Sequence, residues 1–192
     1  DSIARHWLPE VIQQYRRAHP GVGVDIQMGS VQEVYRWVQE GRVDMCFASR
    51  QESVALDWTP LRDDELFAIL PPDYDNGGRT VFPVQDFSGR EFIMPSMGFN
   101  LDIMRVLNRH GVLPLIRTTQ VSDSVIISMV EHGLGVSMLS RLVLQGRQDD
   151  VQALPLEPRA VRELGIASRP RRELRPAVRS FITEAREMIE KM

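Results

Sequence analysis

Side chains that could act as nucleophiles or acid–base catalysts are few in this chain, and their surroundings do not favour catalysis. The single cysteine, Cys46, lies in the mostly apolar run 43–48, which is typical of a buried strand. We therefore expect Cys46 to be a small buried hydrophobic residue rather than a nucleophile paired with a histidine. The acidic residues 63–65 form a charge run, which is typical of a solvated loop.

The histidines are explained without catalysis or metal binding. Three of the four, His19, His110 and His132, stand where helices are expected to end. A partly charged imidazole stabilises the negative end of the helix dipole there. No pair of histidines, His6 included, has the spacing of zinc ligands. The sequence thus predicts no catalytic residue, no metal ligand and no cofactor.

Two glycines in the stretch Gly133-Leu134-Gly135 suggest a phosphate-binding loop, but their context does not fit one. A dinucleotide loop runs from a strand into a helix and carries a third glycine, so that the helix N-terminus faces the phosphate. Here Gly133 follows an expected helix and leads into a strand, and Met138 occupies the position of the third glycine. We expect Gly133 to be the left-handed residue just beyond a helix end.

Three short polar turns precede expected helices and could together hold a small carboxylate. These turns are residues 1–3, 96–98 and 122–124. Helix N-termini present unpaired N–H groups and partial positive charge, and hydroxyls from Ser2, Ser96, Ser122 and Ser124 could orient a ligand. The same serines are ordinary N-cap residues, so capping alone is an alternative explanation for each. Asp123 disfavours an anion nearby unless its carboxylate turns away.

Several other residues are candidates for ligand contacts, each with a structural alternative. Ile3 belongs to the first polar turn, and Ser49 follows an expected strand at its carboxyl end, where α/β proteins bind ligands. Gly98 could let the backbone approach a ligand, or could simply permit a turn. The apolar residues Met97, Phe99 and Met138 could line an adaptable pocket or belong to the core. The basic run 169–175 is interpreted as a solvated turn rather than a phosphate contact.

The spacing of apolar residues predicts the elements that would position these candidates. Helices are expected within 7–18, 31–40, 99–110, 125–132 and 176–189, and extended segments at 22–28, 43–48, 58–61, 66–70, 91–94, 116–121, 136–139 and 163–167. This alternation of helices and short strands predicts the α/β class, with mostly parallel strands covered by helices.

Composition excludes several classes of protein. The 192 residues are 43% hydrophobic and 26% charged, as in ordinary globular proteins. The formal charge of -3 argues against a free-standing nucleic-acid binder. No apolar run is long enough to span a membrane, and the first residues lack the pattern of a signal peptide. We therefore expect a soluble, cytoplasmic protein without a membrane partner.

Four segments, in order along the chain, resemble the effector-binding domain of LysR-type transcriptional regulators. HWLPEVIQQYRRAHPGVGVDIQMG is similar to that family's first helix and second strand, and EGRVDMCFA to its following strand. VQDFSGREFIMP resembles the entry to its second subdomain, and VSDSVIISMVEHGLGVSML resembles a late turn, helix, Gly-Leu-Gly and strand. Together these segments cover nearly the whole chain.

The resemblance implies a fold like type 2 periplasmic binding proteins: two Rossmann-like subdomains, joined by two crossover strands, with an effector cleft between them. Subdomain I would be 1–70 plus 156–192, and subdomain II 71–155. The three polar turns would face the cleft. The family forms antiparallel homodimers and, at full length, tetramers. It binds DNA through an N-terminal winged helix-turn-helix and linker helix, which this sequence lacks, as it lacks the family's first strand.

Two alternatives remain open from the sequence. A solute-binding protein of a transporter has the same fold but would normally be exported behind a signal peptide. An enzyme on this fold would need a cleft with an acid or nucleophile of perturbed pKa. We expect a non-enzymatic sensor of a small metabolite, with neither a signal peptide nor an acid or nucleophile of perturbed pKa in its cleft.

Overall fold

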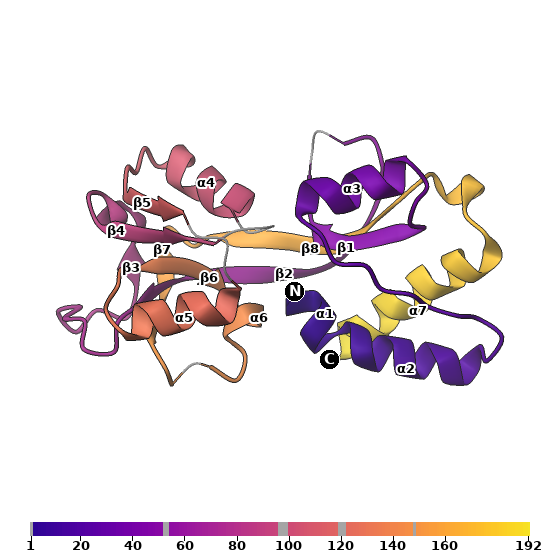
Figure 1. Cartoon of the computed structure of the whole chain (residues 1–192), viewed down its shortest axis with the longest axis horizontal. Helices are drawn as coiled ribbons and strands as arrows, with labels where there is room; N and C mark the ends of the chain where they lie inside the picture. The colour runs from indigo at the N-terminus through magenta and orange to yellow at the C-terminus, as the bar shows by residue number, and fades with distance from the viewer. Residues whose placement is uncertain (1, 52–53, 96–99, 119–121, 148) are drawn as a thin grey trace. The chain divides into compact units, whose positions relative to one another are not determined.

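The chain forms two compact units (Figure 1). The structure is a computed structural model that describes residues 2–51, 54–95, 100–118, 122–147 and 149–192. Unit 1 comprises Asp1–Asp63 and Glu163–Met192, and unit 2 comprises Asp64–Arg162. The chain passes between the units twice, inside strands β2 (Asp57–Leu70) and β8 (Val161–Ser168). The boundaries expected from the sequence, 70/71 and 155/156, fall within unit 2.

Unit 1 is built around an antiparallel strand pair and its helices. Its complete elements are α1 (Ser2–His6), α2 (Leu8–Ala18), α3 (Val31–Gln39), β1 (Met45–Ser49), the 3-10 helix η2 (Arg171–Glu173) and α7 (Pro176–Lys191). Strand β1 pairs with β8, from Met45 opposite Ser168 to Ser49 opposite Leu164. Helices α2 and α7 lie side by side (Figure 1), where the Tyr15 hydroxyl donates to the Ala177 carbonyl at 2.9 Å.

Helix α3 is positioned by its own sequence signals. Ser30 and Glu33 form a capping box, in which each side chain accepts a hydrogen bond from the other residue's backbone N–H. The apolar face of α3 packs on β1, through a buried cluster that includes Tyr35, Val38 and Cys46. A helix with a fixed start and a buried face cannot easily rotate, so the side chains on that face keep a defined direction relative to β1.

The extended segment 22–28 does not form the strand that its alternating apolar residues predict. Among the described residues, none pairs with it as a strand, and Ile26 and Met28 are 50% and 55% exposed. Alternation indicates a half-buried strand only where a neighbouring strand supplies the ladder and a core covers one face. The strand prediction for 22–28 is therefore wrong for this structure.

Unit 2 contains strands of two sheets. Its complete elements are β3 (Phe82–Pro83), the 3-10 helix η1 (Val84–Phe87), β4 (Glu91–Met94), α4 (Asn100–Arg109), β5 (Leu115–Thr118), α5 (Asp123–Glu131), β6 (Ser137–Ser140), α6 (Arg141–Leu144) and β7 (Gln152–Glu157). The second half of β2 pairs antiparallel with both β6 and β7, whereas β3 runs parallel to β7 and β4 parallel to β5. The larger sheet, which includes β2, β3, β6 and β7, is thus mixed and only the β4–β5 pair is a purely parallel sheet, so the prediction of mostly parallel strands is wrong.

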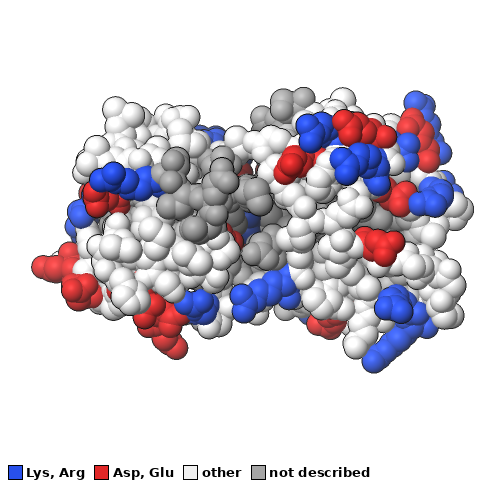
Figure 2. Space-filling view, viewed as in Figure 1, with Lys and Arg blue, Asp and Glu red and all other residues white. Residues whose placement is uncertain are grey.

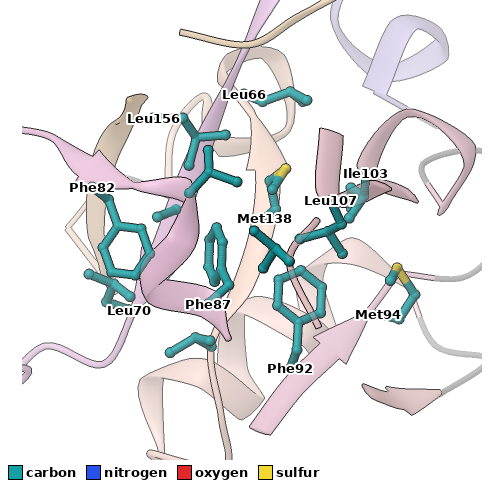
Figure 3. Packing of buried hydrophobic residues seen from close by; sticks show 14 residues of the cluster. Leu66, Leu70, Phe82, Phe87, Phe92, Met94, Ile103, Leu107, Met138 and Leu156 are labelled. Atoms are coloured by element: carbon teal, nitrogen blue, oxygen red, sulfur yellow. The ribbon is translucent and has the colours of Figure 1, made fainter. Parts of the chain in front are cut away.

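The continuous apolar run at the end of β2 explains why both faces of the sheet are covered. Leu66, Ala68 and Leu70 pack in one buried cluster with residues of α4 and η1. Phe67 and Ile69 point to the other face and pack with α5. Figure 3 shows the first cluster, in which Phe82, Phe87 and Phe92 lie among aliphatic side chains. Alternate residues of a strand point to opposite faces, so a run buried throughout needs two layers of cover.

The Gly-Leu-Gly stretch ends α5 and brings the following chain onto β4. Gly133 has φ of +72°, and the N–H groups of Gly133 and Leu134 donate to the carbonyls of Val130 and Met129. This is a Schellman motif, which confirms the predicted left-handed residue beyond the helix end. A Cβ on Gly135 would lie 2.8 Å from the Glu91 carbonyl oxygen, so glycine permits the close approach of the two segments.

Candidate functional site

The carboxyl end of β1 in unit 1 carries a buried hydroxyl. Ser49 is 3% exposed, and its Oγ has no hydrogen-bond partner among the described residues. Its backbone carbonyl, in contrast, accepts from the Tyr35 hydroxyl at 3.1 Å and from Gln51 Nε2 at 3.5 Å. The Tyr35 hydroxyl in turn accepts from the Gln51 N–H at 3.2 Å. A buried hydroxyl that lacks a protein partner is a natural position for a ligand hydrogen bond.

The other candidates in unit 1 belong to the short helix α1. Ser2 and Ile3 are both buried, at 7% and 8% exposure, and so the first turn of α1 is packed rather than solvated. Position 1, which completes the predicted polar turn, lies outside the described residues. The structure therefore gives α1 a buried start, and a ligand role for Ser2 and Ile3 stays a prediction.

In unit 2 the turn before α5 has the features of a helix start without a side-chain cap. Ser122 is the N-cap residue, but its hydroxyl does not accept from the helix N–H groups; it lies 2.9 Å from the Ser124 hydroxyl. Both serines are exposed. Capping, the alternative explanation for Ser122, is thus not realised here. Asp123, between them, is half-buried, and burial raises the pKa of its carboxyl group.

The acidic run 63–65 was expected to be a solvated loop, and this expectation is wrong. It lies within β2, where Asp64 is 5% exposed and pairs with the equally buried Arg162 of β8. Asp64 Oδ2 accepts from Arg162 Nε at 2.9 Å and from Nη2 at 2.7 Å. Glu65 pairs with two arginines on the surface, and the hydrogen bond from Arg141 is the main cause of its lowered pKa.

The buried pair of Asp64 and Arg162 also anchors helix α6. Asp64 Oδ1 accepts from the Leu142 N–H at 3.0 Å, and so supplies the N-terminal cap that the Ser140 side chain does not. Ser140 Oγ instead accepts from Arg162 Nη2 at 2.9 Å. Burial lowers the pKa of the Arg162 guanidinium, and the carboxylates of Asp64, Asp102 and Asp123 oppose that shift. Because Asp64, Arg162, Ser140 and the Leu142 N–H hydrogen-bond to one another, we assign this network a structural role.

Met138 and the turn 96–99 complete the predicted set. Met138 is fully buried in the core of unit 2 (Figure 3), so its side chain presents no surface to a ligand in this structure. Its alternative explanation as a core residue fits this packing. Ser96, Met97, Gly98 and Phe99 lie outside the described residues.

The residues considered for catalysis behave as structural residues. Cys46 is buried, and burial raises the pKa of its thiol to about 12, so the thiolate needed for nucleophilic attack does not form near neutral pH. His19 Nε2 lies 2.8 Å from Glu184 Oε1, which links the end of α2 to α7. Within the described ranges, no group of three histidine, cysteine or acidic residues is placed to hold a metal ion.

The charged surface is mixed in sign. Figure 2 shows Lys and Arg side chains beside Asp and Glu on the visible face. In the basic run 169–175, Arg175 forms an ion pair with Asp44 at 2.9 Å, and the Arg171 N–H donates to Asp57. This pairing fits the interpretation of the run as a solvated turn. None of the helices in the described part of the chain is long and apolar enough to cross a membrane.

The sequence patterns did not identify two of the polar residues that shape these sites, Tyr35 and Arg162. Tyr35 looked like one more apolar residue on the inner face of α3, because the spacing with Val31 and Val38 accounts for its burial. Arg162 lies 98 positions from Asp64, and no local pattern connects the two. Only the occurrence of a charged residue inside an apolar strand segment could have drawn attention to Arg162.

Comparison with known proteins places these features in a family. The chain matches the family described as the LysR substrate binding domain over residues 1–190. It is 23% identical over 190 residues to the HTH-type transcriptional regulator CbbR of Rhodospirillum rubrum, which covers 94% of this chain and 62% of that protein. The chain spans less than two thirds of the length of this relative and of another regulator, YvbU of Bacillus subtilis.

Solved structures with low sequence identity share the fold. The regulatory domain of CcmR from Synechocystis PCC6803, in complex with 2-PG, has a TM-score of 0.87 at 21% identity. The match covers 100% of this chain and 95% of the CcmR chain. The effector binding domain of QuiR in complex with shikimate has a TM-score of 0.86 at 19% identity, with coverage of 99% and 93%. The family match over residues 1–190 shows that this chain belongs to the LysR substrate binding domain family.

Proposed function

We propose that this chain, as a member of the LysR substrate binding domain family, is the effector-sensing part of a transcriptional regulator. The observation that carries the proposal is the family match over residues 1–190. It is supported by relatives that are themselves regulators, which favours a regulator over a solute-binding protein of a transporter. Two proteins of the same fold are described in complex with small molecules, 2-PG and shikimate, so a small metabolite is the expected ligand class.

The proposed ligand contacts come from both units. In unit 1 they are Ser2, Ile3 and Ser49, and Ser49 is the strongest because its buried hydroxyl has no partner among the described residues. In unit 2 they are Ser122, Asp123 and Ser124, at the start of α5. We retain Ser96, Met97, Gly98 and Phe99 from the sequence, and we leave out Met138 because the core already accounts for it.

The proposed mechanism is a shift between conformations of the regulator. A ligand that binds one conformation more tightly raises its population, and only this difference in affinity can do so. The DNA response would be made by an N-terminal winged helix-turn-helix in the full-length protein, acting in the cytoplasm. Neither DNA binding nor catalysis is assigned to this chain.

We further propose that the chain forms a homodimer, as part of a tetramer at full length. The support comes from apolar side chains at two extended edges. Ile26 and Met28 are exposed on the unpaired segment 22–28 of unit 1. In unit 2, Leu113, two residues before β5, and Leu115, the first residue of β5, are 80% and 59% exposed; the only partner of β5 among the described strands is β4. Exposed apolar edges of this kind are typical of protein interfaces.

A thermal-shift screen tests the sensor proposal. The panel contains small carboxylates, amino acids, aromatic acids and sugars. A ligand at one hundred times its Kd stabilises by about 2.7 kcal/mol, and each 1 kcal/mol raises Tm by roughly 2–4 °C in a chain of this size. We expect Ser124→Trp, at the start of α5, to abolish the shift. Glu131→Trp, at the exposed end of the same helix about 10 Å away, should leave it unchanged.

Two results would contradict the proposal. If a compound stabilises the wild type and Ser124→Trp equally, it binds elsewhere and the assigned contacts are wrong. If no class of compound shifts the Tm of the folded chain, the sensor function itself loses its support.

A further inference from the structure

The hydroxyl of Ser49 is buried at a cost that the described protein atoms do not offset. Buried polar groups in native proteins almost always have a hydrogen-bond partner, and an exception calls for a specific explanation. Ser49 lies at the carboxyl end of a strand and is the last residue of β1. In an exposed loop the same hydroxyl would form hydrogen bonds with water. Its burial here must therefore be imposed by the surrounding structure.

Tyr35 supplies that constraint on the turn 49–51. Its hydroxyl donates to the Ser49 carbonyl at 3.1 Å and accepts from the Gln51 N–H at 3.2 Å, so one side chain holds both ends of the turn. On the other side, the Arg50 N–H donates to the Glu163 carbonyl of β8 at 2.9 Å. Tyr35 is 4% exposed and is fixed by α3, whose first turn carries the capping box.

We propose that Tyr35 is a positioning residue of the effector site: it fixes the turn 49–51 so that the Ser49 hydroxyl is held ready to hydrogen-bond a ligand. The inference rests on the proposed sensor function and names the group that prepares one of its contacts. A polar contact that is already in place binds its ligand more tightly, because the turn does not have to lose conformational freedom when the ligand binds.

The same geometry indicates which ligand atom meets Ser49. The groups that hydrogen-bond the adjacent Ser49 carbonyl are the neutral hydroxyl of Tyr35 and the neutral amide of Gln51. The nearest charged residue in sequence, Arg50, is compensated by Glu163 at 3.0 Å. With no net charge supplied by these residues, we expect the ligand group at Ser49 to be uncharged, a carbonyl or a hydroxyl, rather than fully ionised.

The matched variants Tyr35→Phe and Tyr15→Phe test the positioning role without any ligand. Both remove one buried hydroxyl of unit 1 that donates to a backbone carbonyl, at 3.1 Å in Tyr35 and 2.9 Å in Tyr15. We expect amide hydrogen exchange at Gln51 to accelerate by about tenfold or more in Tyr35→Phe, the loss expected for one hydrogen bond, and to stay unchanged in Tyr15→Phe. Equal Gln51 protection in both variants would overturn the proposal.

Ser49→Ala tests whether the hydroxyl is kept for a ligand. Removing an unpaired buried hydroxyl should leave the urea midpoint of unfolding unchanged or higher, whereas a lower midpoint would mean that the hydroxyl has a structural partner and would overturn the inference. With shikimate as the probe, whose hydroxyl groups are uncharged, binding should be about tenfold weaker to Tyr35→Phe and to Ser49→Ala than to the wild type. If the probe does not bind the wild type, that result counts against the sensor proposal. The measurements made without ligand test the role of Tyr35 separately.

Discussion

The two units bury polar groups in opposite ways. In unit 1, the Ser49 hydroxyl is buried without a partner among the described residues, while its backbone is held by Tyr35. In unit 2, the Arg162 guanidinium is buried as deeply but is paired with Asp64 and Ser140. Burial alone therefore does not mark a binding site. The difference lies in whether the described protein atoms satisfy the buried group, which is why we propose Ser49 as a ligand contact and assign Arg162 a structural role.

The largest expected effect follows from breaking the pair in unit 2. Arg162→Met leaves Asp64 buried without its cation, which should lower the free energy of unfolding by about 3–5 kcal/mol. Urea unfolding followed by circular dichroism measures this loss. Arg50→Met, which removes one partner of an ion pair that is half exposed on both sides, should cost less than about 1 kcal/mol. A similar loss in both variants would show that the buried pair has no special role.

Removing both charges should give a smaller effect than removing one. The double variant Asp64→Leu/Arg162→Met has no unpaired buried charge, and apolar replacements of buried ion pairs are often tolerated. It still loses the Asp64 cap on α6. We expect its free energy of unfolding to lie within about 2 kcal/mol of the wild type, measured in the same urea titrations. If the double variant is as unstable as Arg162→Met, charge pairing does not explain how the network stabilises the fold.

The smallest expected effect concerns Glu65 and acid pH. Hydrogen bonds from Arg141 and then Arg159 lower the pKa of Glu65 in the folded chain. A carboxylate with a lowered folded pKa stabilises the fold above its unfolded pKa, about 4.3, and this contribution is lost as pH falls through the folded value. Glu65→Gln should therefore lose less stability than the wild type between neutral pH and pH about 3. Parallel stability curves for the two proteins would exclude this contribution.

The sequence predicted those features whose causes are local. The end of α5 at Gly133 and the burial of Cys46 were confirmed, because a glycine after an amphipathic helix and a cysteine in an apolar strand carry their own signal. The segment 22–28 was predicted as a strand because alternation was present, but a strand also needs a neighbour, and none of the described residues pairs with it.

The candidate site was predictable only in part, for the same reason. Ser49 was selected because it follows a strand, and this position is visible in the sequence. Tyr35 was missed because its hydroxyl acts across 14 positions and its ring fits an ordinary helix face. The acidic residue Asp64 was misassigned to a loop because its partner, Arg162, is brought to it only by the pairing of distant strands.

We propose that this chain binds a small metabolite through the contacts assigned in unit 1 and in unit 2. The most direct test of this proposal is an amide NMR titration of the chain with the panel compound that gives the largest thermal shift. We predict saturable chemical-shift changes at Arg50 and Gln51 in unit 1 and at the first turn of α5 in unit 2. Changes confined to other regions, such as α2 and α7, would contradict the assigned site.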